Sequence, residues 1–362
     1  MKITRFNEIH KALGAKLVEF AGFQMPIQYP TGIIYEHNTV RQKVGVFDVS
    51  HMGEFEIRGS EALNFLQYLT INDVSKLEKG NIQYSAMCFE DGGIVDDFLV
   101  YNMGDYYMMI VNGANIEKDW IWVNKIAANF NVEIANVSDD YNLLAVQGPN
   151  SLKVIQKLTS NNLENIKFYN FELGKVAGID TIISRTGYTG EFGFELYFKG
   201  DEIIAKKMWD SLFEAGEEFG IIPVGLGARD TLRMEKGYCL YGNDIDATTN
   251  PIEAGLGWIT KFNKGPFVAS EILAKIKEEK PARNLVGISS EAEKFIPRHG
   301  YKLFYENQEI GHITSGNISP TLNKPIAIGY VDANFKAIGT KIEVEARGKR
   351  FPAVVTKMPF LA

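Results

Sequence analysis

The segment after Pro281 constrains the fold most, because it contains six short strand-like runs and no helical pattern. These runs lie near residues 284–289, 301–305, 309–314, 326–331, 341–346 and 351–357. Many short strands with turns between them are typical of small all-β domains. A lysine- and glutamate-rich stretch at 275–280 precedes the proline and marks a domain boundary. The sequence therefore predicts an all-β, barrel-like domain at the C-terminus.

The residues before this boundary mix helical and strand patterns, which predicts an α+β fold. Helical spacing covers 33–44 (ended by Gly45), 61–70, 114–129, 201–219 and 226–236, and strand-like runs cover 53–58, 83–89, 94–102, 106–112, 142–147, 179–185 and 194–198. The runs 83–89, 94–102 and 106–112 are closely spaced, with Asp and two glycines in the turn at 90–93, so they are predicted to be adjacent antiparallel strands.

Composition and motifs exclude several classes of protein. The formal net charge is -7, which argues against a general nucleic-acid binder. Cys88 and Cys239 form no CxxC pair, and the five histidines are scattered, so we expect no metal site. No run of 18 apolar residues occurs and the start lacks a secretory signal pattern, so we expect a cytoplasmic enzyme that spans no membrane.

The segment GGIVDDFLVY (92–101) places two adjacent aspartates in an otherwise apolar strand. Side chains alternate between the faces of a strand, so Asp97 shares a face with Tyr101, whereas Asp96 lies on the other face. Buried carboxylates are costly unless they are partnered, and they are enriched at functional sites. Either the aspartates cap a neighbouring turn or they belong to a site, and the pattern alone leaves both alternatives open.

The segment RTGYTGEFGFELY (185–197) combines three glycines with a carboxylate inside a strand. Glycines allow tight turns and close approach to a ligand. Glu195 could accept two parallel N–H bonds from a planar amidine-like edge, such as that of a reduced pterin. A salt bridge to a nearby arginine is the simpler structural interpretation, and the residues alone favour it slightly.

The segment GLGARDTLRMEKGYCLYGNDID (225–246) places Arg229 and Arg233 on one side of a helix. A salt-bridged helix face is the interpretation that the pattern favours. The alternative is that Arg229 lies in a site near the helix start. Residues 44–59 contain His51 and Met52 and are predicted to be a structural link from helix to strand.

These segments, taken in order, resemble the T-protein family of the glycine cleavage system. The resemblance runs over nearly the whole chain and includes FAGFQMPIQY (20–29), VGVFDVSHMGEF (44–55), GGIVDDFLVY (92–101), VNGANIEKD (111–119), LLAVQGP (143–149), RTGYTGEFGFELY (185–197), GLGARDTLRME (225–235), YGNDIDATTNPIEAGLGW (241–258), ITSGNISPTL (313–322) and VVTKMPF (354–360).

The resemblance implies a three-domain, cloverleaf-like arrangement of mainly antiparallel sheets around a central folate site. The implied domains are a discontinuous folate-binding domain (1–52 plus about 140–245), an inserted α+β domain (53–139), a connecting segment (246–280) and the C-terminal β domain (281–362). The implied reaction moves the methylene carbon of an aminomethyl group from the lipoyl arm of a carrier protein, the H-protein, to tetrahydrofolate, and ammonia is released. No metal is required.

The resemblance also implies roles for particular residues. Asp97 matches the catalytic carboxylate, and Glu195 matches the residue that grips the pterin edge. Tyr101 is expected on the same strand face as Asp97, and no role is carried to Asp96 or Arg233. The remaining expected folate-site residues are Tyr188, Asn112 and Arg229, with Tyr84, Met52 and Tyr238 as further candidates.

The sequence departs from the family pattern at Phe192, where an acidic residue is usual, and this change is expected to affect the loop beside the pterin. The sequence ends at Ala362, soon after KMPF, where some relatives have a longer tail that reaches the folate. Two alternative functions stay open: a folate-dependent demethylase of a methylated amine, and a non-catalytic folate-binding module. The binding module carries a KGCYxGQE-type motif, whereas this chain has KGYCLYGND at 236–244.

Overall fold

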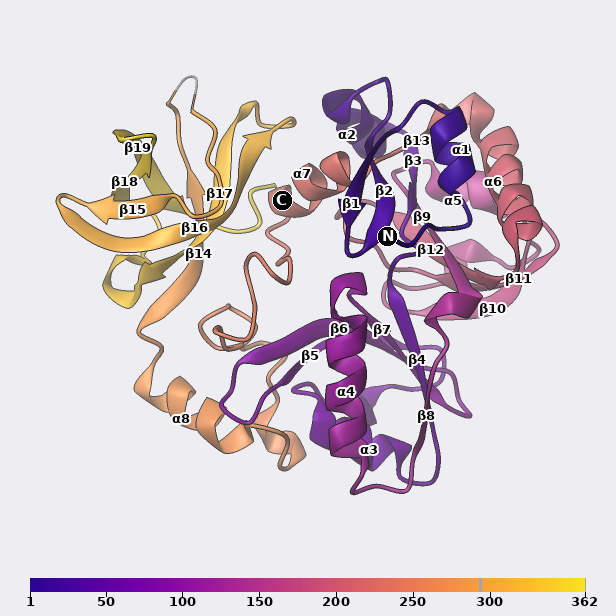
Figure 1. Cartoon of the computed structure of the whole chain (residues 1–362), viewed down its shortest axis with the longest axis horizontal. Coiled ribbons are helices and arrows are strands. Elements are labelled where there is room, and N and C mark those ends of the chain that lie inside the picture. Colours follow the sequence, from indigo (N-terminus) through magenta and orange to yellow (C-terminus); the bar gives the residue numbers. More distant parts are fainter. Residues whose placement is uncertain (293–294, 362) are drawn as a thin grey trace. The chain divides into compact units, whose positions relative to one another are not determined.

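The computed structural model describes residues 1–292 and 295–361 (Figure 1). The chain forms two compact units, and each unit consists of three separate stretches of sequence. The first unit comprises Met1–Leu66, Val74–Tyr84 and Phe98–Asp230. The second unit comprises Gln67–Asp73, Ser85–Asp97 and Thr231–Ala362. Helices and sheets are mixed, as the sequence predicted, and no helix of the described ranges is both long and apolar enough to cross a membrane.

A six-stranded sheet forms the centre of the first unit, in the order β10-β11-β12-β9-β3-β13. Every neighbouring pair is antiparallel except β13 with β3, which run parallel. The first unit also contains a separate hairpin of β1 and β2. The strands of the sheet and hairpin are β1 (Lys16–Phe20), β2 (Phe23–Gln28), β3 (Val44–Asp48), β9 (Tyr141–Gln147), β10 (Phe171–Val176), β11 (Ile179–Ser184), β12 (Gly193–Lys199) and β13 (Ile221–Pro223).

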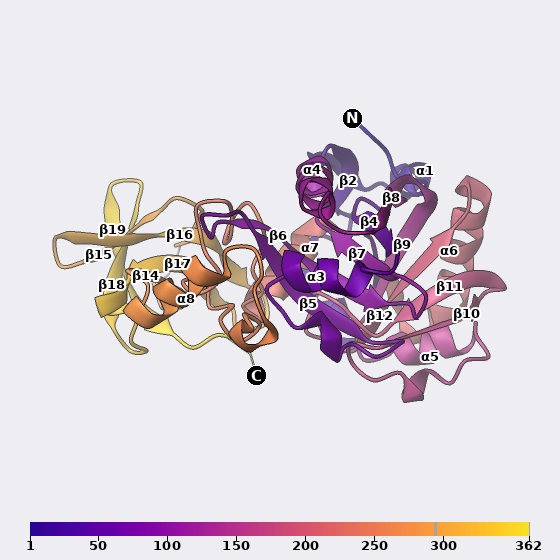
Figure 2. The same cartoon turned by 90° about the horizontal axis from the view of Figure 1, so that it is seen from below.

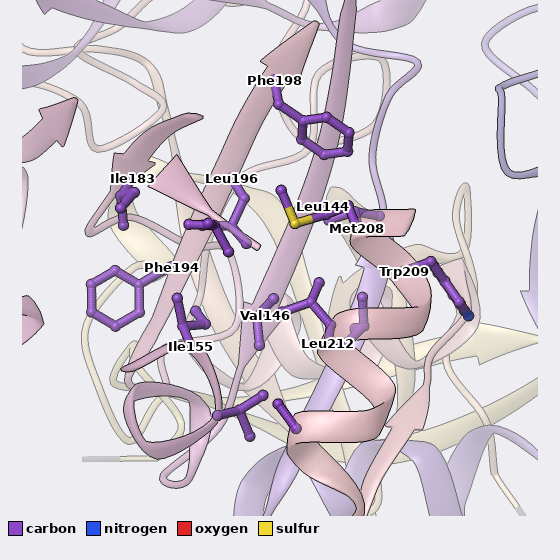
Figure 3. Close-up of a cluster of buried hydrophobic side chains, with 14 of the residues drawn as sticks. Leu144, Val146, Ile155, Ile183, Phe194, Leu196, Phe198, Met208, Trp209 and Leu212 are labelled. Atoms are coloured by element: carbon purple, nitrogen blue, oxygen red, sulfur yellow. The ribbon is translucent and has the colours of Figure 1, made fainter. Parts of the chain in front are cut away.

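One face of this sheet packs against helices α5 (Ser151–Gln156) and α6 (Glu202–Gly216). Figure 3 shows the core, in which side chains of β9 and β12 point toward α6. Asp201 caps α6 by accepting hydrogen bonds from the backbone N–H groups of Ile203 and Ile204, each at 3.1 Å. The buried side chains of this core include Leu144, Val146, Ile183, Phe194, Leu196, Phe198, Met208 and Leu212.

A five-stranded sheet follows the order β5-β6-β7-β4-β8. Helix α4 packs against it, with the rings of Trp120 and Phe55 meeting edge to face at 5.3 Å between centroids. The antiparallel pairing predicted for the strands between 83 and 112 is confirmed where β6 pairs with β7. The elements are β4 (Gly53–Arg58), α3 (Ala62–Leu69), β5 (Ile82–Cys88), β6 (Ile94–Asn102), β7 (Tyr107–Val111), α4 (Ile116–Ala127) and β8 (Glu133–Asn136).

The C-terminal strands close into a six-stranded barrel in the order β14-β17-β16-β15-β18-β19 (Figure 2). This confirms the all-β, barrel-like domain predicted from the sequence. Strand β16 extends well beyond the predicted 309–314 and shifts register between Ile313 and Ser315. The strands are β14 (Arg283–Ser289), β15 (Lys302–Tyr305), β16 (Gln308–Ser319), β17 (Lys324–Asp332), β18 (Lys341–Ala346) and β19 (Lys349–Thr356), and helix α8 (Ser270–Glu279) precedes them.

Three local predictions differ from the structure. Helix α2 (Ile33–Gln42) ends before Gly45, and that glycine lies inside β3, which the sequence treated as a link. All five residues of β3 are buried, so the strand lacks the alternation by which half-buried strands are recognised. The helix predicted at 201–219 ends at Gly216 and continues as a 3₁₀ turn to Phe219. Further elements that were not predicted are helices α1 (Asn7–Ala12), α5 and α8 and strands β1, β2, β8, β10 and β13.

Helix α7 (Leu226–Glu235) ends in the second unit with two buried charged residues. The Arg233 guanidinium donates to the Asp244 carboxylate at 2.7 Å and to the Ser315 hydroxyl at 2.8 Å. The Glu235 carboxylate accepts from the hydroxyls of Ser319 at 2.5 Å and Thr321 at 3.0 Å. Arg233 is therefore salt-bridged, as the pattern favoured, but its partner lies in a loop beyond the helix, and both buried residues attach the helix end to barrel residues.

Replacing Arg233 with alanine is expected to lower the free energy of unfolding of the second unit by about 3–5 kcal/mol, because the buried Asp244 carboxylate loses its countercharge. Urea denaturation followed by circular dichroism measures the change. The control is Lys206→Ala, which removes an exposed ion pair with Asp210 and should cost about 0.3–0.5 kcal/mol. Equal effects of the two substitutions would contradict a buried ion pair at Arg233.

Candidate functional site

The second face of the six-stranded sheet carries polar side chains. In the register of the sheet, Glu195 of β12 lies opposite Ser184 of β11 and opposite Ala145 of β9. Tyr197 lies two residues along β12, so it shares the face of Glu195, whereas Leu196 points into the helix-covered core. The sequence pattern therefore places Glu195 on the one face that the core does not use.

Four hydroxyl groups connect Tyr197 to Glu195 on this face. The hydroxyl oxygens of Tyr197 and Tyr101 are 3.1 Å apart. The hydroxyl oxygens of Tyr101 and Ser184 are 2.8 Å apart. The Ser184 hydroxyl lies 2.8 Å from that of Thr186, and the Thr186 hydroxyl donates to the Glu195 carboxylate. Tyr101 comes from β6, so this chain of hydrogen bonds joins the two sheets of the first unit.

The loop between β11 and β12 is fixed by the side chain of Gln147. Its amide nitrogen donates to the carbonyl oxygens of Thr186 at 3.1 Å and Phe194 at 3.4 Å, and its amide oxygen accepts from the Thr189 hydroxyl at 2.9 Å. A Cβ on Gly187 would lie 2.1 Å from the Gln147 amide oxygen, and one on Gly193 would lie 2.5 Å from the amide group. The two glycines are therefore required by the space that the Gln147 side chain occupies.

Arg41 and Phe192 hold the outer part of the same loop. The Arg41 guanidinium donates to the Thr189 carbonyl at 2.6 Å and to the Glu191 carboxylate at 2.9 Å. The Phe192 ring lies under the Arg185 guanidinium, with 3.4 Å from Cζ to the ring centroid. Phe192 thus holds the loop through a cation–π contact with Arg185.

Arg229 brings a positive charge close to Glu195. Its Cζ lies 4.9 Å from the ring centroid of Tyr188. Burial raises the pKa of the Glu195 carboxyl, while the Thr186 hydrogen bond and the Arg229 charge lower it, and the balance is an upward shift. Burial, followed by the same Arg229 charge, lowers the pKa of His51 to about 3, so this histidine is neutral.

This grouping suits a flat ligand with an N–H edge. The half-buried Glu195 carboxylate is an acceptor, the Arg229 guanidinium is a donor, and the Tyr188 ring offers an apolar face. No group of three or more His, Cys, Asp and Glu side chains in residues 1–292 and 295–361 has the arrangement of a metal site.

Strand β6 carries both Asp97 and Tyr101, as predicted. Asp96 is fully buried, whereas Asp97 is half-buried, so the two adjacent carboxylates have different exposure. The residues expected at the site fall in both units. Asp97 and Tyr238 belong to the second unit, and the first unit contains Met52, Tyr84, Tyr101, Asn112, Tyr188, Glu195 and Arg229.

The first unit brings Glu195, Arg229 and Tyr188 together and connects Tyr101 to Glu195 through hydroxyls. Tyr84 of β5 is half-buried, and so are the remaining three candidates. Asn112 precedes a 3₁₀ turn at Gly113–Asn115, and Met52 lines a cavity of about 370 Å³ that also contains Arg5 and Ser138. In the second unit, the Tyr238 carbonyl accepts a hydrogen bond from Arg233 at 2.9 Å.

The sequence patterns do not indicate Gln147, Ser184, Thr186 or His51 as residues of this region. The strand parity of 194–198 could have placed Ser184 near Glu195, had the pairing of β11 with β12 been known. No local signal indicates Gln147, because its partners lie about 40 residues further along the chain. The imidazole Nδ1 of His51 is buried and has no hydrogen-bond partner in the described residues.

Replacing Gly187 with alanine is expected to lower the melting temperature by a few degrees, because the added Cβ displaces an amide that makes three hydrogen bonds. Differential scanning fluorimetry measures the shift. The matched control is Gly257→Ala, since a Cβ there meets no atom within 4 Å. Identical melting curves for the two variants would mean that the Gln147 side chain does not need this space.

Comparisons with known proteins agree along the whole chain. The family described as the GCVT N-terminal domain matches residues 6–264, and the glycine cleavage T-protein C-terminal barrel domain matches residues 283–361. The chain is 51% identical to an aminomethyltransferase of Halothermothrix orenii over 362 residues, which is 100% of both proteins. It is 54% identical to an aminomethyltransferase of Bacteroides fragilis over 365 residues, which is 99% of both.

A solved structure has the same fold. The glycine cleavage system aminomethyltransferase T from Bartonella henselae matches with a TM-score of 0.93 and 33% identity, covering 99% of this chain and 98% of that one. Two matched domains, full-length relatives at about half identity and the fold lead to one conclusion: the chain belongs to the glycine cleavage T-protein family.

Proposed function

We propose that this protein is a tetrahydrofolate-dependent aminomethyltransferase of glycine cleavage. The observation that carries the proposal is the identity of 51% to an aminomethyltransferase over the full length of both chains. In the proposed reaction, the methylene carbon leaves the sulfur of an aminomethyl-dihydrolipoyl carrier protein and becomes bonded to two nitrogens of tetrahydrofolate. Ammonia and the dihydrolipoyl carrier are released, and no electrons are gained or lost.

Glu195 is the proposed acceptor for the pterin. The edge of a reduced pterin carries two N–H donors in parallel, which match the two oxygens of a carboxylate. The half-buried Glu195 carboxylate receives one donor from Thr186 and lies near the Arg229 charge, so one oxygen and a lone pair of the other remain for a ligand. The Tyr188 ring beside Arg229 is the proposed stacking surface. Asn112, Tyr84, Met52 and Tyr238 are proposed further folate contacts by their match to the family pattern.

Asp97 is the proposed catalytic carboxylate. A pterin nitrogen must attack the methylene carbon, and it must lose a proton as the new bond forms. A carboxylate that is half-buried can accept a proton while staying accessible to substrate, and Asp97 has this exposure whereas Asp96 is fully buried. Asp97 would therefore orient the folate and stabilise or move the positive charge, with Tyr101 on the same strand face.

The proposed partners are the lipoylated H-protein and tetrahydrofolate, in the cytoplasm, with neither a metal nor nucleic acid involved. The decisive experiment measures ammonia release from an aminomethylated lipoyl carrier protein with and without tetrahydrofolate. Release that depends on tetrahydrofolate and yields methylene-tetrahydrofolate would support the proposal. Saturable folate binding without turnover would favour a demethylase or a binding module, and methylated amines would then be tested as substrates.

The substitution Asp97→Asn is expected to keep tetrahydrofolate binding but to reduce kcat at least about 100-fold, because the amide cannot accept the proton. Steady-state ammonia release and isothermal titration with tetrahydrofolate measure the two quantities. Asp96→Asn is the matched control on the neighbouring position, and its effect should fall on stability. Unchanged kcat in the Asp97 variant would remove this residue from the catalytic role.

The substitution Glu195→Ala is expected to weaken tetrahydrofolate binding about 10- to 100-fold, because two N–H groups of the pterin lose a charged acceptor. Titration calorimetry measures the dissociation constant. Glu191→Ala is the control, since that carboxylate lies in the same loop and pairs with Arg41. A binding isotherm for the Glu195 variant that matches the parent would restore the salt-bridge interpretation.

A further inference from the structure

We propose that Thr186, Ser184, Tyr101 and Tyr197 form a one-directional chain of hydrogen bonds that holds the Glu195 carboxylate oriented and ionised for its ligand, with Thr186 as the essential positioning residue. None of the four hydroxyls needs to touch the folate in this role. The inference rests on the proposed function, because it assigns a purpose to groups behind the carboxylate that the proposed function places on the pterin.

The direction of the chain follows from counting protons. An ionised carboxylate only accepts, so the single Thr186 proton is committed to Glu195. The Ser184 hydroxyl must then donate to Thr186, and its own proton is committed in turn. Consequently the Tyr101 hydroxyl donates to Ser184. The Tyr197 hydroxyl therefore donates to Tyr101, and all four protons point toward Glu195.

Burial keeps the four hydroxyls from exchanging their partners for water. Ser184, Thr186, Tyr101 and Tyr197 are all buried, so each hydroxyl must find its partners within the protein. Burial is the main cause that raises the pKa of Tyr101 and of Tyr197. The second cause is the charge of Glu195 for Tyr101 and the neighbouring Tyr101 hydroxyl for Tyr197. Both phenols therefore stay protonated and remain donors. Hydrogen bonds in such a chain polarise one another, so the last donor to the carboxylate is strengthened.

The groups around Glu195 explain why the carboxylate needs the hydrogen bond from the four hydroxyls. Within the first unit, the Thr186 hydroxyl and the charge of Arg229 of α7 act on Glu195, whose own charge acts on Tyr101 of β6 and Tyr197 of β12. Tyr197 of the same strand is further influenced by the buried Glu54 carboxyl of β4. Burial raises the pKa of Glu195 and so favours its protonated form, whereas the Thr186 hydrogen bond and the Arg229 charge favour the ionised form. A protonated Glu195 would offer one acceptor oxygen and one donor, which does not match the two N–H groups of a pterin edge.

The geometry also separates Thr186 from the rest of the loop. The Thr186 carbonyl is held by Gln147, so the backbone position is fixed without the hydroxyl. Changing the hydroxyl alone therefore tests the hydrogen bond and leaves the loop in place. Valine has nearly the shape of threonine, and it replaces the donor with a methyl group.

The experiment compares Thr186→Val with the parent by titrating tetrahydrofolate under argon between pH 5 and 8. Removal of a charge-assisted hydrogen bond is expected to weaken binding about tenfold near neutral pH. Binding needs the ionised carboxylate, so affinity falls as the pH drops through the pKa of Glu195. Thr186→Val removes a donor that favours ionisation, so the pKa rises and the fall in affinity begins at a higher pH than in the parent.

Three further variants make the test specific. Thr186→Ser restores the hydroxyl and should restore the parent pH profile. Thr181→Val is the matched control, since its buried hydroxyl on β11 donates only locally, to the Ile179 carbonyl at 2.8 Å. Tyr101→Phe removes the third hydroxyl and should shift the profile less than Thr186→Val. In kinetics, Thr186→Val should raise KM for tetrahydrofolate and leave kcat nearly unchanged.

The outcomes distinguish the inference from the proposed function. If Glu195→Gln binds tetrahydrofolate like the parent at every pH, the folate role of Glu195 itself fails. If Glu195→Gln is impaired but Thr186→Val behaves like Thr181→Val, only the inference is overturned. If circular dichroism shows that Thr186→Val does not fold, Ser184→Ala is tested instead. A pH profile of tetrahydrofolate affinity for Ser184→Ala that matches the parent then overturns the inference.

Discussion

Strand β9 imposes the constraint on which the first unit depends, because all seven of its residues are buried. It pairs with β12 on one side and with β3 on the other, so neither edge is open. Of its even-numbered side chains, Leu144 and Val146 enter the helix-covered core (Figure 3), and Asn142 donates hydrogen bonds to the Phe198 and Gly200 carbonyls. Its odd-numbered side chains must face the other way, and the last of these is Gln147. The register of one strand thus decides which face holds the hydrocarbon core and which holds the polar groups.

The polar face is stable because its groups satisfy one another. A buried hydroxyl without a partner costs free energy comparable to a lost hydrogen bond. On this face Gln147 uses both its donor and its acceptor on the loop, and Thr186 links the loop to Glu195. The loop is therefore fixed before any ligand arrives, and little conformational entropy remains to be lost on binding. The glycines at 187 and 193 follow from the same arrangement.

The sequence predicted most elements and the C-terminal barrel because their periodicity is local. Strands such as 94–102 and 341–346 alternate or are bounded by turns, so their existence follows from neighbouring residues. Strand β3 was missed because it is short, contains Gly45 and has no alternation, whereas the equally buried β9 has a longer apolar run. The burial of Arg233 was missed for a different reason: its partner Asp244 lies beyond the helix, in a loop whose path the helical pattern does not specify. The hydroxyls behind Glu195 come from three strands or their ends, and only the sheet register brings them together.

Phe192 ties the outer part of the loop to Arg185 through its ring. Arg185 is half-buried, and burial lowers the pKa of its guanidinium without making it neutral in the accessible pH range. Its Nε has no hydrogen-bond partner in the described ranges, and its guanidinium lies over the Phe192 ring at 3.4 Å and near the Phe194 ring at 5.6 Å. The two rings also contact each other, with 5.6 Å between their centroids. Phe194 belongs to the helix-covered core, so the rings hold the Arg185 cation from that side, whereas Glu195 lies on the opposite face of β12. The loop is therefore fixed by aromatic rings on the core side of the sheet and by the Gln147 amide on the polar side.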